Sequence, residues 1–120
     1  MKRNLLMAAL LAIAGVAPAA PYPLADDFES GLGLWATNGA WGLTTAGPRS
    51  PTHAVADSPG AFYTNGADTA LAVASALNMV GAVRPVLRFY ARYSLESDFD
   101  FLRVEVSTNG GAAWQSRGAA

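Results

Sequence analysis

The stretch that decides the fold reads VLRFYARY from Val86 to Tyr93, and FLRVEVST follows it from Phe101 to Thr108. Apolar side chains fall on odd-numbered positions in the first stretch and on even-numbered positions in the second. This period of two is typical of strands that bury one face, because successive side chains of a strand point to opposite sides. The two stretches therefore predict two half-buried strands.

The same pattern predicts how these strands pair. Antiparallel strands share a buried face here only when an odd-numbered residue of the first stands opposite an even-numbered residue of the second. The register that we prefer places Arg88 opposite Glu105 and Tyr90 opposite Arg103, and such cross-strand pairs contribute about 0.2–1 kcal/mol each. A neighbouring register opposes Arg92 and Arg103, two like charges, and is disfavoured.

Short strands separated by turns are expected outward from this pair. Trp35 and Trp41 bracket Thr37-Asn38-Gly39, and the Asn-Gly sequence is typical of a hairpin because it accommodates positive φ. Residues 46–69 are rich in Gly, Pro, Ser, Asn and Asp, a loop composition with room for short strands. The strands expected from these signals cover residues 26–29, 53–56 and 61–63, and another begins near Trp114.

Residues 68–80 support two interpretations. Apolar side chains at helical spacing from Ala70 to Val80 fit a helix that Asp68 and Gly81 would cap. The strands expected on both sides favour a strand over residues 71–74 followed by a loop. We prefer the strand, because it is consistent with its neighbours in an all-β fold.

Residues 1–19 are typical of a signal peptide, which we expect to be helical. A basic start precedes the apolar run from Leu5 to Val16, which is too short to span a bilayer as a helix. Ala17-Pro18-Ala19 supplies a cleavage site of the small-x-small type. We therefore expect export to a secreted or cell-surface location, with residues 20–25 as an extended lead-in to the domain.

The charge of the exported chain limits the kinds of partner that it can bind, and its cysteine content limits the ways in which it can be stabilised. Removing Lys2 and Arg3 leaves six basic and nine acidic side chains, a net charge of −3. An acidic chain without a basic stripe does not fit a nucleic-acid partner, and no second apolar run is long enough to cross a membrane. The chain has no cysteine, so a small exported domain needs a core or a metal ion in place of disulfides.

Together these elements predict an all-β fold, an antiparallel two-sheet jelly-roll sandwich over residues 26–120. The sequence stops at Ala120, soon after the strand expected at Trp114 begins, and this would leave an edge strand without a partner. We therefore expect an incomplete domain that is truncated at its C terminus.

Several stretches, taken in order, resemble one group of domains. They are Asp27-Phe28-Glu29-Ser30-Gly31, the spaced Trp35 and Trp41, His53 with Ala56-Asp57-Ser58-Pro59-Gly60, Leu87 to Glu96, and Val104 to Trp114. Together they resemble the MAM-like, concanavalin-type jelly-roll domains of immune inhibitor A-type metallopeptidases and bacillopeptidase F-type subtilases, and the cleaved-adhesin domains of bacterial surface proteins. The resemblance covers nearly all of residues 26–115 and implies an extracellular setting.

The order of segments argues against peptidase activity. In the proteases that the chain resembles, the module follows a catalytic domain, whereas here it follows the predicted signal peptide directly. The resemblance therefore implies a non-catalytic accessory module that binds a substrate, a carbohydrate or an extracellular protein surface. Two alternatives stay open: a purely structural, calcium-stabilised fragment of a secreted peptidase, and a secreted hydrolase.

His53, the single histidine, is the natural starting point for a catalytic site. Ser50, Ser58 and Asp57 are near it in the sequence, but no Gly-x-Ser-x-Gly elbow accompanies them. One histidine without cysteine would leave carboxylates to complete a zinc site. We therefore expect His53 to have a structural hydrogen-bonding role and the protein not to be an enzyme.

Calcium is the cofactor that the acidic residues fit best, since it binds carboxylate and backbone carbonyl oxygens. A strand over residues 26–29 would place Asp27 and Glu29 on one face. Asp57 and Asp68 lie in loop-forming stretches that offer carbonyl groups. The resemblance implies a structural calcium near the first strand, with Glu29 and Asp57 among its ligands. The alternative is that all four carboxylates are solvated turn residues.

A ligand-binding face is expected on the outer side of the predicted strand pair. Aromatic and bidentate polar groups on a sheet suit a sugar or a peptide. The alternative is a solvated sheet face with cross-strand ion pairs. The side chains that would share this face are Arg88, Tyr90, Arg92, Arg103 and Glu105.

Overall fold

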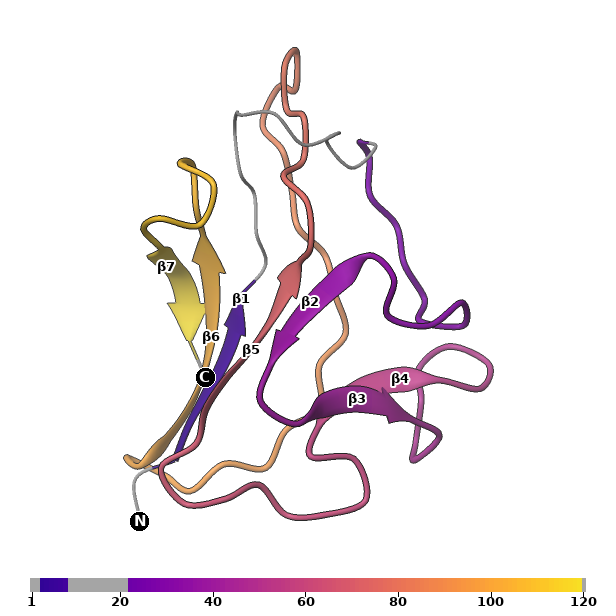
Figure 1. Ribbon diagram of the computed structural model, residues 1–120, viewed down its shortest axis with the longest axis vertical. Helices are drawn as coiled ribbons and strands as arrows, with labels where there is room; N and C mark the ends of the chain where they lie inside the picture. Colours follow the sequence, from indigo (N-terminus) through magenta and orange to yellow (C-terminus); the bar gives the residue numbers. More distant parts are fainter. Residues whose placement is uncertain (1–2, 9–21, 120) are drawn as a thin grey trace.

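The computed structural model describes residues 3–8 and 22–119, and all regular elements within these ranges are strands (Figure 1). The prediction of an all-β fold is therefore confirmed for the described residues. They form a five-stranded sheet in the order β2-β5-β1-β6-β7 and a separate pair of β3 and β4. The strands are β1 (Arg3–Ala8), β2 (Trp35–Asn38), β3 (Trp41–Thr44), β4 (Ala54–Asp57), β5 (Asp68–Val73), β6 (Asp100–Val106) and β7 (Gln115–Ala119).

Strand β5 buries alternate side chains, and β6 does so from Asp100 to Arg103. Thr69, Leu71 and Val73 of β5 are buried, and the alanines between them are only half-buried. In β6, Leu102 is buried and its neighbour Arg103 is exposed. The period of two thus decides which face of each strand turns to the core.

The core is small and lies at the end of β5. A buried cluster is formed by Val73, Leu77 and Met79. Leu77 and Met79 come from the irregular chain that follows the strand, so the helical interpretation of residues 68–80 is wrong. The residues that pack against this cluster are Leu24, Trp35 and Ala82.

The tight turn between β2 and β3 carries the chain from one sheet to the other. β2 pairs antiparallel with β5 and β3 pairs antiparallel with β4, so Trp35 and Trp41 do not flank a hairpin. The predicted turn is present, and Gly39 has a φ of +87°. Trp41 Nε1 donates to Thr69 Oγ1 at 3.1 Å, and this bond holds β3 across the start of β5 rather than beside β2.

Two short strands lie where turn signals predict them, and a third does not form. β4 follows His53 and β7 follows Trp114. Residues 61–63 form no strand, and the side chain of Phe62 among them is 94% exposed. β7 pairs antiparallel with β6 across a turn in which the buried Ser107 Oγ accepts a hydrogen bond from the backbone N–H of Gly111 at 2.8 Å.

Residues 86–93 are not a strand, although their alternation predicts one that pairs with β6. β6 pairs with β1 on one side and with β7 on the other, so both of its edges are occupied. The segment instead runs back past β5 outside the sheet (Figure 1). Its apolar side chains are left partly exposed, Leu87 by 54% and Phe89 by 41%.

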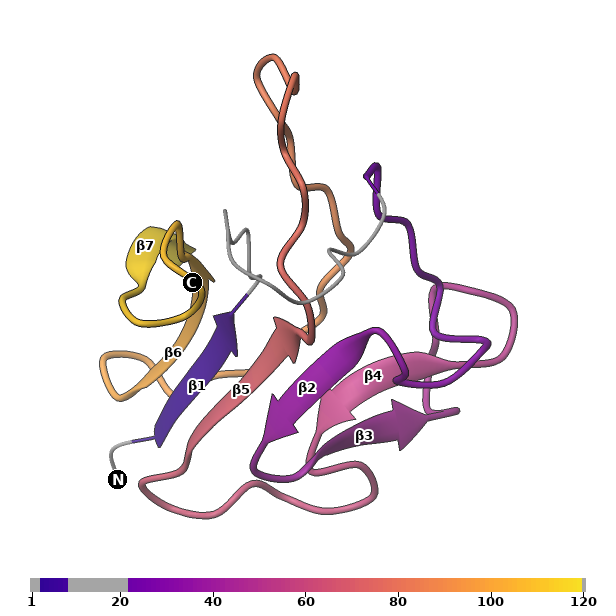
Figure 2. The same ribbon diagram turned by 45° about the horizontal axis from the view of Figure 1, so that its top comes forward.

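β1 lies inside the five-stranded sheet, parallel to both β5 and β6 (Figure 2). It is the described part of the predicted signal peptide, and it is extended where we expect a helix, because the open edges of β5 and β6 satisfy its backbone groups. Residues 9–19, with the rest of the apolar run and the cleavage site, lie outside the described residues. The described ranges contain no helix with the length and apolar character that crossing a membrane requires.

Replacing Gly39 with alanine is expected to lower the free energy of unfolding by at least about 1–2 kcal/mol, because a left-handed backbone disfavours a Cβ. The added Cβ would also lie 2.8 Å from the Cβ of Thr69 in β5. Urea unfolding measures the change.

Gly33→Ala is the matched control for this substitution. Nothing lies within 4 Å of a Cβ added at Gly33, and its φ is outside the left-handed region. Its stability should therefore stay within about 1 kcal/mol of the wild-type value. Equal stabilities for the two variants would contradict the close packing of the β2–β3 turn against β5.

Candidate functional site

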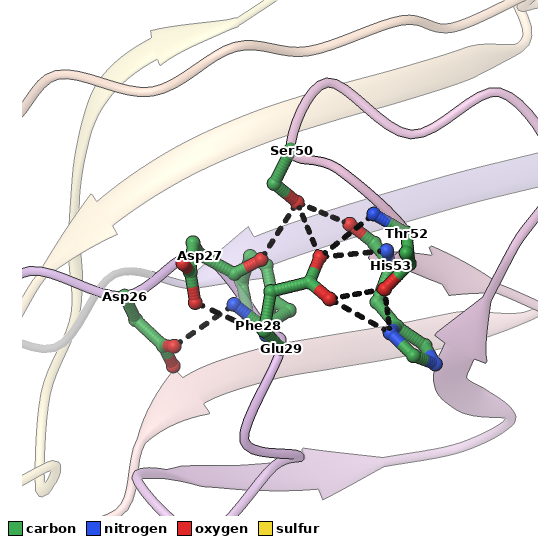
Figure 3. Close-up of polar contacts among 7 residues, drawn as sticks. All are labelled: Asp26, Asp27, Phe28, Glu29, Ser50, Thr52 and His53. Atoms are coloured by element: carbon green, nitrogen blue, oxygen red, sulfur yellow. Dashed lines mark hydrogen bonds and ion pairs between the residues drawn. The ribbon is translucent and has the colours of Figure 1, made fainter.

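The acidic residues 26–29 form a tight turn rather than the strand that we expect from the sequence. Asp26 Oδ1 accepts from the backbone N–H of Phe28 at 2.9 Å, and Asp27 Oδ1 accepts from that of Glu29 at 3.1 Å (Figure 3). Aspartate favours such bonds to the backbone two residues ahead, and this preference overrides the extended conformation. Phe28 has a φ of +65° within this turn.

Trp35 at the start of β2 holds this turn in place. Its Nε1 donates to Asp26 Oδ2 at 2.6 Å. Its ring also packs against the ring of Phe28, with the centroids 5.6 Å apart. The turn is therefore attached to the five-stranded sheet by one polar and one aromatic contact.

The Glu29 carboxylate reaches from this turn to the loop before β4 and receives hydrogen bonds there (Figure 3). Oε1 accepts from Ser50 Oγ at 3.0 Å and from the backbone N–H groups of Thr52 and His53 at 3.1 and 2.8 Å. Oε2 accepts from Thr52 Oγ1 and lies 3.1 Å from His53 Nδ1. One carboxylate thus joins two chain segments that are far apart in the sequence, and we call this group the Glu29 cluster.

These donors explain the acidity of Glu29. The hydroxyl of Thr52, then the side chain and backbone of His53, hold the pKa of the Glu29 carboxyl well below its usual range. Each bond favours the ionised form because an ionised carboxylate is the better acceptor. The carboxylate is therefore charged throughout the ordinary pH range.

Oxygen atoms crowd around the Ser50 hydroxyl at the edge of the Glu29 cluster (Figure 3). Ser50 Oγ lies 2.8 Å from the Asp27 carbonyl oxygen, 3.0 Å from Glu29 Oε1 and 2.5 Å from the His53 carbonyl oxygen. All three neighbours are acceptors, and a hydroxyl has a single proton to donate. Two of these contacts are therefore between oxygens that share no hydrogen, an arrangement that a cation would relieve.

The other two predicted calcium ligands stand apart on the strands. Asp57 ends β4, and Asp68 is exposed at the start of β5. Burial is the main cause that raises the pKa of Asp57, against smaller opposing effects of the Ser58 and Thr69 hydroxyls. Within the described part of the chain, no three His, Cys, Asp or Glu side chains gather closely enough to hold a metal ion.

Asp100 is a buried carboxylate, whereas its position between the strands expected at residues 86–93 and 101–108 predicts a solvated loop charge. It is 4% exposed, and its Oδ2 accepts from Tyr63 OH at 2.6 Å and from the Glu96 backbone N–H at 3.2 Å. Its Oδ1 makes no hydrogen bond to the described residues. These bonds anchor the turn that enters β6. The alternating pattern could not reveal this role, because the strand expected from it begins at Phe101 and leaves Asp100 in the loop before it.

The predicted ligand-binding residues do not share one sheet face in this arrangement. Arg88, Tyr90 and Arg92 lie on the irregular segment 86–93. Arg103 and Glu105 lie on β6, paired with β1 and β7 instead. The two groups are separated because residues 86–93 do not enter the sheet.

The segment 86–93 instead contacts the loop before residue 50. The guanidinium carbon of Arg49 lies 4.5 Å from the centre of the Tyr90 ring. Arg92 donates to the Ala46 carbonyl oxygen at 3.1 Å. Neither Arg49 nor Ala46 stands out in the sequence, since long-range contacts of loops leave no periodic signal.

His53 takes part in the Glu29 cluster rather than in a triad with Ser50. Its Nδ1 lies 2.8 Å from Thr52 Oγ1 and 3.1 Å from Glu29 Oε2. The described contacts of Ser50 Oγ are to the backbone of His53 and to the acidic turn, whereas a nucleophilic serine bonds to the imidazole ring. The partners Ser50 and Thr52 could have been suspected from their hydroxyls beside His53, but their link to Glu29 depends on the fold.

Glu29→Gln is expected to flatten the acid branch of the stability profile. Since the folded pKa of Glu29 is lowered from its ordinary value of 4.5, its contribution is complete above that pH and is lost as the pH falls below it. Denaturant unfolding between about pH 6 and pH 2.5 measures the slope. The wild type should lose stability more steeply than the variant below about pH 4.5.

Glu96→Gln serves as the control for this pH series, because its side chain is exposed outside the cluster. It should keep the wild-type slope. Parallel acid branches for wild type and Glu29→Gln would show that the cluster does not form in solution.

Comparisons of the chain with protein-family models, with curated proteins and with solved structures find no match. The features that bear on function are therefore the Glu29 cluster and the exposed segment 86–93.

Proposed function

We propose that the chain is a non-catalytic accessory module of an exported bacterial protein, a jelly-roll β-sandwich that calcium stabilises at the Glu29 cluster. The export signal predicted for residues 1–19 and the resemblance to extracellular jelly-roll domains support the extracellular setting. The all-β fold in two sheets is compatible with a sandwich. The observation that carries the proposal is the crowding of acceptor oxygens around Ser50.

Calcium suits this group because its preferred ligands are carboxylate, carbonyl and hydroxyl oxygens. The candidate ligands are the Asp27 carbonyl, Glu29 Oε1, Ser50 Oγ and the His53 carbonyl. Ligands bound to one calcium at about 2.3–2.6 Å lie roughly 3 Å from each other, which is the spacing that surrounds Ser50. Calcium binding by Asp57 and Asp68, which the sequence predicts, is not part of this group, because these residues lie on strands β4 and β5.

The charge of the cluster also favours a cation. Glu29 is ionised over the ordinary pH range, and the backbone N–H groups of Thr52 and His53 orient its carboxylate. The two carbonyl oxygens add partial negative charge at the same point. A calcium ion there would join the turn at residues 26–29 to the loop before β4.

Binding of a carbohydrate or an extracellular protein surface is the role that we propose for the exposed segment 86–93. Tyr90 is 79% exposed, and the Arg49 guanidinium lies against its ring. An aromatic ring beside a guanidinium suits stacking and bidentate hydrogen bonding to such partners. The acidic charge of the exported chain makes nucleic acid a poor partner.

Millimolar calcium is expected to raise the thermal midpoint of the full chain by at least about 4 °C relative to EDTA, the shift that roughly 1 kcal/mol of binding linkage produces in a domain of this size. Differential scanning calorimetry in the two conditions measures the shift. Glu29→Gln should abolish it, because the substitution removes the only carboxylate among the candidate ligands.

Asp98→Asn is the matched control, since Asp98 is an exposed turn residue with a φ of +68° that asparagine accommodates. This variant should keep the calcium response. Superimposed curves for the wild type in calcium and in EDTA would refute the calcium site.

A further inference from the structure

The position of β1 is unusual within its sheet. β1 is parallel to β5 on one side and to β6 on the other, whereas the remaining pairs, β2 with β5 and β6 with β7, are antiparallel (Figure 2). It follows that β5 and β6 run in the same direction with the width of one strand between them. A strand that ran the opposite way would fit this position and make the sheet antiparallel throughout.

The chain between β5 and β6 contains a segment with the properties of that strand. A chain that leaves β5 and enters β6 in the same direction must run back once, and residues 86–93 do so (Figure 1). A central antiparallel strand joined to both neighbours is a simple meander, and it needs only short connections. Residues 94–99 are enough to turn from this segment into β6.

The register of β1 shows which residues of β5 and β6 would lie beside the segment 86–93 if it took this position. Leu5 pairs with Thr69 of β5 and with Leu102 of β6, so these two buried residues belong to one row across the sheet. Continuing two residues along both strands places Leu71 and Val104 in the next row of the same face. An antiparallel segment 86–93 would put Phe89 between Leu71 and Val104.

The same register places the remaining side chains of the segment favourably. Leu87 would lie between Val73 and Val106 on the buried face, so side chains that are now exposed would be covered. On the outer face, Arg88 would stand beside Glu105 and Tyr90 beside Arg103. This is the register that the sequence alone favours, and it brings the candidate ligand-binding residues onto one face.

We propose that β1 occupies the sheet position of residues 86–93, and that removal of residues 1–19 lets this segment pair between β5 and β6 and assemble the ligand-binding face. The inference rests on the export proposed above, because it requires cleavage of the leader. In the precursor Tyr90 lies against the Arg49 guanidinium, whereas after removal of the leader it would lie beside Arg103. All five candidate ligand-binding residues would share one face only in the second arrangement.

Pairs of cysteines distinguish the two arrangements, because the wild-type chain has no cysteine. Leu6→Cys with Arg103→Cys reports the precursor, since these residues are partners in β1 and β6. Tyr90→Cys with Arg103→Cys reports the exchanged sheet. Ala91→Cys with Arg103→Cys is the register control, because residues 91 and 103 would point to opposite faces.

The full chain would be made by cell-free translation without membranes and oxidised before or after treatment with bacterial signal peptidase. Mass spectrometry of alkylated protein would report cleavage and free thiols. Before cleavage, most of the Leu6→Cys/Arg103→Cys protein should form a disulfide and the Tyr90→Cys/Arg103→Cys protein should keep both thiols. After cleavage, most of the Tyr90→Cys/Arg103→Cys protein should be cross-linked, and the Ala91→Cys/Arg103→Cys protein should not.

Three other outcomes would overturn the proposal, and each rejects a different part of it. Cleavage that leaves the thiols of Tyr90→Cys/Arg103→Cys free rejects strand exchange and leaves the proposed export intact. No cleavage rejects export, and strand exchange with it. Cross-linking of that pair in an uncleavable Ala17→Phe/Ala19→Phe precursor would show that the leader does not control the exchange.

Discussion

The Glu29 carboxylate is the constraint on which the rest of the arrangement depends. Its hydrogen bonds join positions that are 21 to 24 residues apart in the sequence and so close a long loop of the chain. One end of that connection is attached to β2 through Asp26 and Trp35, and the other leads into β4. Because β2 and β4 belong to different sheets, a single charged side chain helps to fix one sheet relative to the other.

Hydrogen bonds between side chains do much to hold distant segments of the chain together, because the apolar core is small. Among the described residues, the buried apolar side chains are Leu71, Val73, Leu77, Met79 and Leu102. A small domain without disulfides gains little from such a core and depends on additional connections. The bonds of Asp26 to Trp35, of Trp41 to Thr69 and of Asp100 to Tyr63 supply them between distant segments. A cation at the Glu29 cluster would add to the same set.

The sequence predicts the strands with clear alternation and fails where the partner of a segment decides its structure. β6 could be found from its alternation, whereas the strand at β5 is preferred over a helix only because strands are expected on both sides of it. Residues 86–93 have an equally clear pattern, but alternation defines a face and says nothing of which strand edge is open. The turn at residues 26–29 could not be predicted for a different reason. The carboxylates of Asp26 and Asp27 accept hydrogen bonds from backbone N–H groups two residues ahead, and these bonds compete with an extended strand. Glu29 could be proposed as a ligand, whereas its contacts with Ser50 and Thr52 required the fold.

Terbium luminescence offers the most direct measurement of the central claim, that the oxygens around Ser50 form a cation site beside the Glu29 carboxylate. Tb³⁺ takes the place of calcium at oxygen-rich sites. Trp35 contacts Asp26 and Phe28 in the turn that carries Glu29, so it is the expected sensitiser. The account predicts luminescence on excitation of tryptophan that calcium competes away and that Glu29→Gln abolishes. Equal luminescence from the wild type and Glu29→Gln would contradict it.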